Sequence, residues 1–335
     1  AGIMQDVSLV SARRALNTTY AVVEGVVSLS RREGGAHRVN TDIEGQVHLF
    51  EELEPDAVVI VGGVDGGASR PVLQSAEANA LACATLPEDS RPPVIYAGNA
   101  QLREQVADLV GADAKLRAVD NGLPSIGLDN PGPLQAEIEE LYRQTKLERL
   151  PGFATLAAWS PVQVLPTAKA LSHTVRYLAR LDGISVLGVD VGGASVSLAS
   201  MIEEQADLSI RSDLGLSYQA AGLLEQVPVE YISRWLPFEM EAADLLNAVH
   251  NKALHPLTLP QTRQDLLLEQ AMAREILRLA VTDIRPRWLK SSSLIYPDLL
   301  PNVHVIVGGG GVLVNAPAYG QAALIMLDAL QPVGV

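Results

Sequence analysis

Residues 183–213 read GISVLGVDVGGASVSLASMIEEQADLSIRSD and carry three short apolar runs joined by tight turns. We predict one strand in each run, over Ile184–Asp190, Ser195–Met201 and Asp207–Arg211. Connections this short join strands that run in opposite directions. The second half of the chain is therefore expected to contain a three-stranded antiparallel meander.

Helices and one further strand are expected around the meander. Before it, the apolar spacing over 166–181 predicts a helix that packs on one face. After it, a helical region is expected over 217–280, with cap signals at Thr262 and Asp265 for its clearest helix. A last strand over Val303–Val307 leads into four glycines and a helix near Tyr319–Leu330.

The first half of the chain alternates strand and helix signals. Strands are predicted over Ala57–Val61, Pro93–Tyr96 and Leu116–Val119. A helix is expected over about 71–84, and Asn99 can cap the next one. This rhythm implies a parallel sheet. The residues expected to share the inner face of the second helix are Leu102, Val106 and Leu109.

Residues 133–142 predict a further helix with its apolar residues facing inward. Glu137, Glu139 and Glu140 lie on the other side and are interpreted as a solvated face. Pro151 and Gly152 then mark a break in the pattern. We therefore expect two domains in the 335 residues. They are a parallel α/β domain over 1–150 and a second lobe over 151–335 with a helical insertion at about 213–300.

Composition and charge narrow the functional classes. Apolar residues make up 48% of the chain and charged residues 19%, which is typical of a globular fold. The net charge of −14 repels phosphate backbones, so nucleic acid is not expected as a partner. Cys83 is the single cysteine, which excludes an internal disulfide and is typical of a cytoplasmic protein.

No membrane association is expected from the sequence. Val305–Leu327 carries no formal charge, but it contains Gly308–Gly311 and Pro317. These residues favour a turn between two elements over a membrane-spanning helix.

The first candidate site is Asp190-Val-Gly192-Gly193-Ala-Ser195, at the end of a predicted strand. Glycines let backbone N–H groups approach a phosphate closely, and Ser195 adds a hydroxyl donor. Asp190 is repelled by phosphate, but it can hold Mg²⁺ through water or orient an attacking water. A plain hairpin turn with a capping aspartate explains the same residues.

The second candidate site is the run Gly308, Gly309, Gly310 and Gly311 between the last strand and a helix. A strand, a glycine run and a helix form a geometry in which a nucleotide can approach the backbone. The alternative is a turn that lets a strand and a helix pack closely.

The third candidate site is GGVDGG, residues 62–67, which follows a strand and precedes a helix. Open α/β sheets bind ligands at this end of their strands. Asp65, Gly66 and Gly67 are the candidate contacts, although Asp65 disfavours a bare phosphate unless a metal intervenes. A structural turn is the alternative.

Six segments together resemble the MutL family that is encoded beside adenosylcobalamin-dependent glutamate mutase, and not the mismatch-repair protein of the same name. They occur in the family's order and cover most of the chain. The segments are ARRAL (12–16), VVIVGGVDGG (58–67), VIYAGN (94–99), LGVDVGGAS (187–195), SDLGLSY (212–218) and VGGGGVLVNAP (307–317).

The resemblance implies an α/β fold of the actin, Hsp70 and sugar-kinase type, in which ATP and Mg²⁺ bind between two lobes. It implies that Asp190, Gly192, Gly193 and Ser195 match the second phosphate loop and that Gly308–Gly311 match the adenosine loop. The meander would then belong to an actin-like (ribonuclease H-like) lobe, beside the parallel α/β domain.

The role that the resemblance implies is that of a reactivating or chaperone-like partner of the subunits of a cobalamin-dependent mutase. Homo-oligomers are also allowed. Relatives carry an earlier first phosphate loop and continue beyond the adenosine loop, so a fragment of a longer protein is expected.

The phosphate loop departs from the family pattern at five positions, two of which bear on phosphoryl transfer. The family's DVGGATTDVHS reads DVGGASVSLAS here, so Ser197 replaces a second acid and Ala199 replaces a histidine. Phosphoryl transfer needs several groups that hold charge, so ATP binding with low ATPase activity is expected. A non-catalytic scaffold with a degenerate site is one alternative. An α/β enzyme that acts on a small anionic metabolite at the Asp65 loop is the other.

Overall fold

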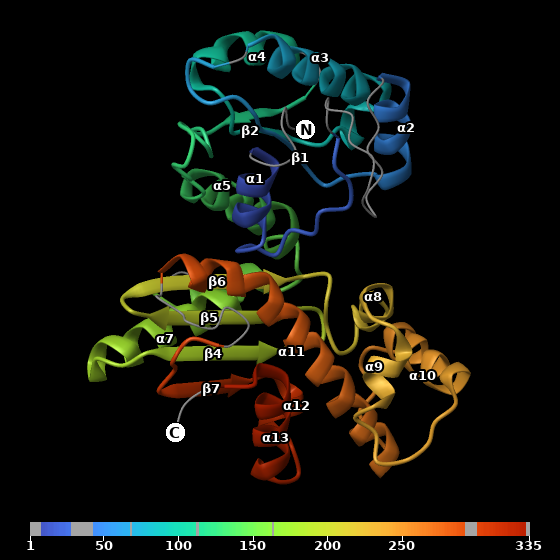
Figure 1. The fold of residues 1–335 in the computed structure, drawn as a ribbon. Coiled ribbons are helices and arrows are strands. Elements are labelled where there is room, and N and C mark those ends of the chain that lie inside the picture. Colours follow the sequence, from blue (N-terminus) through green and yellow to red (C-terminus); the bar gives the residue numbers. More distant parts are fainter. Residues whose placement is uncertain are drawn as a thin grey trace. The chain divides into compact units, whose positions relative to one another are not determined.

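The structure is a computed structural model that describes residues 8–27, 43–67, 69–111, 114–162, 164–291 and 300–332. The chain divides into two compact units, Ala1–Ala154 and Thr155–Val335 (Figure 1). The division falls close to the sequence break at Pro151 and Gly152. Each unit has its own sheet and its own core, so each is described by itself.

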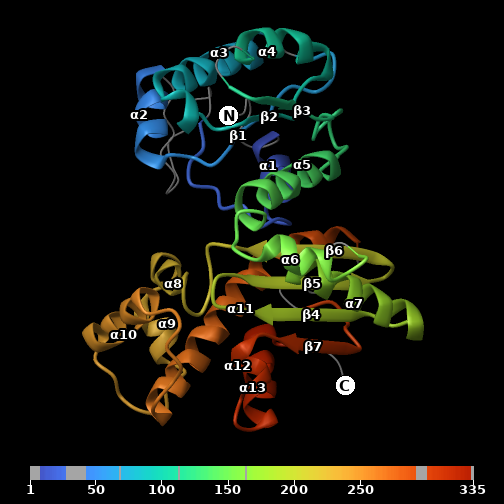
Figure 2. The same ribbon diagram turned by 180° about the vertical axis from the view of Figure 1, so that it is seen from behind.

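The first unit is built on a parallel sheet of three strands in the order β1-β2-β3. The strands are β1 Val58–Ile60, β2 Val94–Tyr96 and β3 Leu116–Ala118, which confirms the predicted parallel sheet. All three residues of β2 are buried, because helices cover both faces of the sheet (Figures 1 and 2). A parallel sheet covered in this way explains the continuous apolar runs in the sequence.

Two cores lie on opposite faces of this sheet. Ile60, Val94 and Tyr96 pack with α3 and α4, whereas Val61 and Ile95 pack with α1 and α5. The helices of this unit are α1 Ser8–Leu16, α2 Ile43–Leu53, α3 Arg70–Thr85, α4 Arg103–Val110 and α5 Gly132–Tyr142. Cys83 on α3 is fully buried in the first of these cores.

Asn99 caps a short turn rather than the helix itself. Its side chain accepts the Gln101 N–H at 3.0 Å, at the start of the 3₁₀ turn Ala100–Leu102 that precedes α4. Within α4 the inner face follows the four-residue spacing from Val106 to Val110, both of which are buried, whereas Leu109 beside it is 36% exposed. The prediction that Leu109 faces inward was therefore wrong.

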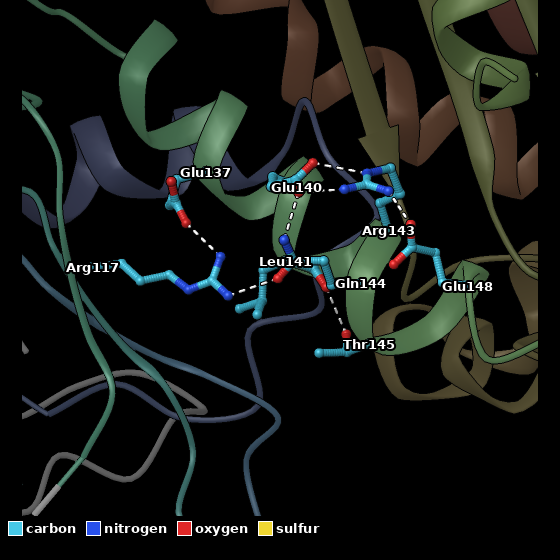
Figure 3. A network of polar contacts seen from close by, with 8 residues as sticks. All are labelled: Arg117, Glu137, Glu140, Leu141, Arg143, Gln144, Thr145 and Glu148. Atoms are coloured by element: carbon cyan, nitrogen blue, oxygen red, sulfur yellow. Dashed lines mark hydrogen bonds and ion pairs between the residues drawn. The ribbon is translucent and has the colours of Figure 1, made fainter. Parts of the chain in front are cut away.

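The acidic side of α5 is not the freely solvated face that the sequence predicts. Arg117 of β3 donates to Glu137 at 2.8 Å and to Gln144 at 2.7 Å (Figure 3). Arg143 donates to Glu140, and this hydrogen bond is the main reason that the pKa of Glu140 lies below its usual value. The acids instead tie β3 and the π-helical turn Arg143–Leu147 to α5.

The second unit contains a sheet of four strands in the order β6-β5-β4-β7. The strands are β4 Val186–Val191, β5 Val196–Ile202, β6 Gln205–Arg211 and β7 Val305–Gly309. β4, β5 and β6 pair antiparallel, which confirms the predicted meander. β7 lies beside β4 and runs parallel to it, although it follows more than a hundred residues later.

Helices cover both faces of this second sheet (Figures 1 and 2). Val175 and Ala179 of α7 pack on one face, and α11 packs on the other with residues such as Ile276 and Ile284. α8, α9, α12 and α13 pack against α11, and α10 packs on α8 and α9. The helices are α6 Phe153–Ala158, α7 Thr167–Asp182, α8 Ala220–Gln226, α9 Val229–Ser233, α10 Ala242–Leu254, α11 Arg263–Ser291, α12 Gly311–Val314 and α13 Tyr319–Leu330.

α11 begins as predicted and runs further than predicted. Thr262 and Asp265 exchange hydrogen bonds between side chain and backbone at its start, which confirms the cap. The helix continues past residue 280 and through Pro286 to Ser291. Trp288 is 1% exposed and donates to the Ser200 hydroxyl at 2.9 Å, so core packing holds the last turns despite the proline.

Val305–Leu327 forms β7, α12 and most of α13, as the glycine run predicts. In the parts of the chain that the structure describes, no helix is both long enough and apolar enough to span a bilayer.

Candidate functional site

The ends of β4 and β7 bring two glycine loops together. Asp190 near the end of β4 is the register partner of Gly309 at the end of β7. A side chain on Gly309 would come within 3.3 Å of the Asp190 Oδ1 atom. Because the strands are parallel, the residues that follow each of them leave the sheet at the same edge. The structure thus places Asp190–Ser195 and Gly308–Gly311 side by side.

Gly310 makes the closest approach between the two strand ends. Its φ is +90°, and a Cβ atom there would lie 2.1 Å from the Val191 carbonyl oxygen. Only glycine fits a backbone so close to its neighbour and so far from the usual φ range. Glycine at position 310 is therefore required by the pairing of the two strands, whether or not a ligand binds there.

The turn after β4 presents unused backbone donors. The Gly192 N–H donates to the Ser195 carbonyl at 2.9 Å and closes the turn. Among the described residues, the backbone N–H groups of Gly193, Ala194 and Ser195 donate no hydrogen bond. Consecutive free N–H groups of this kind form a concave anion site.

A second segment holds this turn in place. The Leu216 and Ser217 N–H groups donate to the carbonyls of Gly192 and Gly193 at 3.0 and 2.9 Å. A Cβ atom on Gly215 would lie 2.4 Å from the Gly193 carbonyl oxygen. The sequence did not predict a role for this SDLGLSY segment, although its isolated glycine between Leu214 and Leu216 is typical of a close backbone approach.

The Asp190 side chain is half-buried beside this turn. No donor among the described residues forms a hydrogen bond with its carboxylate, and desolvation raises its pKa above the ordinary value. A carboxylate in this state lacks the partners that would stabilise its charge. It is therefore suited to a cation or an ordered water.

Ser197 and Ala199 lie on β5 with 2% and 0% exposure. Ser197 is the register partner of Asp190, so its side chain stands directly opposite on the same face of the sheet. An acid at this position would put two carboxylates next to each other. With serine, the edge carries one.

The Asp65 loop has a different character. The Asp65 Oδ1 atom accepts the Ala100 N–H and the Asn121 side-chain N–H, both at 2.8 Å. Asn121 also donates to the Gly63 carbonyl at 3.0 Å, and the Gly66 N–H reaches the Asn99 side chain at 3.3 Å. The loops after β1, β2 and β3 are thereby tied together, which favours the structural interpretation of GGVDGG.

Asn121, which was not predicted from the sequence, is 4% exposed and is the centre of this network. Its side chain accepts the Leu123 N–H at 3.0 Å, and the Asn130 side chain donates to its carbonyl at 3.3 Å. The signal was present in DNGLP, residues 120–124, because an Asn-Gly pair after a strand is typical of a turn.

We predict that Asp65→Ala lowers the stability of the first unit by about 1–2 kcal/mol, because it leaves two donors without their acceptor. Asp65→Asn keeps an acceptor oxygen and should lose less. Far-UV circular dichroism in urea measures the change. The second unit contains all three tryptophans, Trp159, Trp235 and Trp288. The urea transition measured by tryptophan fluorescence should therefore be the same in Asp65→Ala and in the wild type. Equal stability of wild type and Asp65→Ala would contradict the network.

A comparison with protein families covers nearly the whole chain. The family model of MutL protein matches residues 1–334. The chain belongs to the MutL family. The match spans both units of this MutL chain, so the Asp65 loop and the two loops at the β4–β7 edge all belong to the region that defines the family. No curated protein matches the chain.

Proposed function

We propose that this MutL-family chain binds Mg²⁺ and ATP at the β4–β7 edge, in the manner of an actin-like ATPase. The observation that supports it most is the pairing of Asp190 with Gly309, which puts a phosphate-type turn and a glycine run at one edge. The strand order β6-β5-β4-β7, with three antiparallel strands and a parallel fourth, is the arrangement expected of a ribonuclease H-like lobe.

The residues at this edge fit the two ligands. The free N–H groups of Gly193, Ala194 and Ser195 suit phosphate oxygens, and the Ser195 hydroxyl adds a donor. Mg²⁺ is commonly held by one or two carboxylates together with the phosphates of the substrate, and Asp190 supplies one. The metal would neutralise phosphate charge beside Asp190. The glycine run Gly308–Gly311 leaves its backbone open to the nucleoside.

The biological role follows from the family and the site together. We infer that nucleotide binding serves an accessory factor that maintains a cobalamin-dependent mutase in the cytoplasm. With one carboxylate at the edge, ATP turnover is expected to be slow, because phosphoryl transfer needs more than one group that holds charge.

Isothermal titration with Mg²⁺ and ATP tests the proposal. We expect binding with a dissociation constant between micromolar and millimolar. ADP should compete, and a triphosphate without a nucleoside should bind more weakly, because it cannot use the Gly308–Gly311 loop. Absence of heat and of competition across this range contradicts the proposal.

We predict that Asp190→Asn weakens Mg²⁺-dependent ATP binding about 10- to 100-fold, as the loss of a group that supports a metal does. The same change should make the second unit more stable at pH 7. The raised pKa means that the folded state binds more protons than the unfolded state, so the charged carboxylate lowers stability as pH rises. Weaker binding together with higher stability identifies Asp190 as a binding residue. If Asp190 only capped the turn, Asp190→Asn would lower the stability of the unit.

The pH dependence of binding has a defined sign. Only the ionised carboxylate binds Mg²⁺, so affinity for Mg²⁺ and ATP should rise as pH passes upward through the raised pKa of Asp190. In Asp190→Asn this rise should be absent over the same range. A wild-type affinity that does not change with pH would exclude Asp190 from the metal site.

A non-catalytic scaffold is the second candidate function, because Ser197 stands where the family pattern has a second acid. It predicts that the mutase partner binds equally well with and without nucleotide. A tenfold change in that affinity on addition of ATP, about 1.4 kcal/mol of coupling, would contradict the scaffold and support the nucleotide-dependent factor.

A further inference from the structure

The outer face of α7 carries an exposed stripe that the nucleotide site does not use. His173, Arg176, Tyr177, Arg180 and Leu181 together form one shallow, open depression on the surface. Their spacing places all five on one side of the helix, over two turns. Tyr177 is 64% exposed and Leu181 is 62% exposed. Figure 2 shows α7 lying along the sheet, with β4 and β5 beneath it.

This stripe is not needed to attach the helix. The opposite face buries Val175 and Ala179 against β4 and β5. The contact is close, because a Cβ atom on Gly188 would lie 2.6 Å from the Val175 Cγ2 atom. Folding therefore accounts for the inner residues of α7 and leaves the exposed tyrosine and arginines unexplained.

The charge of α7 is opposite to that of the chain. The helix carries three cations, Lys169, Arg176 and Arg180, against the single acid Asp182, while the whole chain has a net charge of −14. Within the described residues, neither Arg176 nor Arg180 forms an ion pair with a carboxylate. The positive charge on this face is thus available to a partner.

We propose that the stripe His173–Leu181 docks an acidic amphipathic helix of a partner protein. Arginine and tyrosine are enriched among the residues that dominate protein interfaces. Acids of the partner would pair with Arg176 and Arg180, and an apolar side chain would pack on the exposed Tyr177 and Leu181 side chains. A long polyanion such as nucleic acid would be repelled by the rest of the chain, whereas a short helix carries few charges.

This docking surface does not depend on nucleotide binding, and the two proposals can fail separately. A photo-reactive amino acid in place of Tyr177 in the full chain tests the surface in cells that produce the protein. The same amino acid at Leu257, which is 83% exposed on another part of the unit, is the control. Mass spectrometry then identifies the segment that is attached at each position.

We expect a segment attached at position 177 only, rich in Asp and Glu with apolar residues at helical spacing. As a synthetic peptide, it should bind the wild-type chain at least tenfold more tightly than Arg176→Glu/Arg180→Glu. The exposed pair Arg70→Glu/Arg263→Glu adds the same charge elsewhere and should bind like wild type. Tyr177→Ala, which leaves the charge unchanged, should also weaken binding.

Other outcomes overturn the proposal. The proposal fails if lipid, nucleic acid, a second copy of this chain or a segment without acids is attached at position 177. It also fails if attachment at position 177 is no greater than at position 257. Equal peptide affinity of the wild type and both stripe variants overturns it as well. Tryptophan fluorescence checks that each variant of the second unit remains folded.

Discussion

Gly310→Ala should lower the free energy of unfolding of the second unit by about 3 kcal/mol or more. The new Cβ atom would meet the Val191 carbonyl oxygen at 2.1 Å, and the φ of +90° disfavours any side chain. The atoms in the way are backbone, so no side-chain rotation relieves the clash. β4 and β7 must separate at the edge that carries Asp190, and we expect ATP binding to be lost.

Gly311→Ala is the matched control in the same loop. Its nearest neighbour would be the Asn315 Nδ2 atom at 3.9 Å, and Gly311 begins α12 with an ordinary φ. Alanine favours a helix, so stability should stay the same or rise slightly. Urea titrations followed by tryptophan fluorescence compare the two variants. Equal stability of Gly310→Ala and Gly311→Ala would contradict the close approach of the two strand ends.

Glu275→Gln should destabilise the second unit by about 1–3 kcal/mol, because a buried carboxylate that accepts several charge-assisted hydrogen bonds becomes a neutral amide. Glu275 of α11 is fully buried and accepts hydrogen bonds from Arg234, Trp235 and Arg278 at 2.7–2.9 Å. The guanidinium of Arg234 also stacks on the Trp235 ring at 4.8 Å. The glutamine leaves these cations without their counter-charge.

This carboxylate attaches α9 and the residues after it to α11, so the helical part of the second unit depends on it. Thermal unfolding followed by tryptophan fluorescence measures the effect, expected as a decrease of about 2–12 °C in Tm. Glu225→Gln on the exposed side of α8 is the control and should change stability by less than about 0.5 kcal/mol. A Glu275→Gln variant as stable as the control would exclude the buried network.

Local sequence patterns predicted the elements of the fold well. The strand Val94–Tyr96 and the cap at Thr262 follow from apolar runs and polar residues that act within a few positions. The prediction for Leu109 was wrong because residues three and four positions after Val106 both lie near its face, and packing selected Val110 over Leu109. The predicted end of α11 was wrong because Trp288 packs against a strand that is distant in the sequence. The local effect of Pro286 on the helix does not include that contact.

The candidate site was only partly predictable. Asp190 and Gly309 stand out as ends of strands, but their pairing depends on two segments more than a hundred residues apart. The sequence alone does not show which of the two carboxylates, Asp190 or Asp65, is free to bind a ligand. The difference lies in their hydrogen-bond partners. The Asn121 side chain and the Ala100 N–H donate to the Asp65 carboxylate, whereas no described donor reaches that of Asp190.

A structure of the chain with Mg²⁺ and a non-hydrolysable ATP analogue is the most direct test of the central claim. We predict phosphate oxygens at the N–H groups of Gly193–Ser195, Mg²⁺ beside Asp190 and the nucleoside against Gly308–Gly311. An analogue bound by the loops around Asp65, or one that contacts only one of the two glycine loops, would contradict the claim that the loops after β4 and β7 form one nucleotide site.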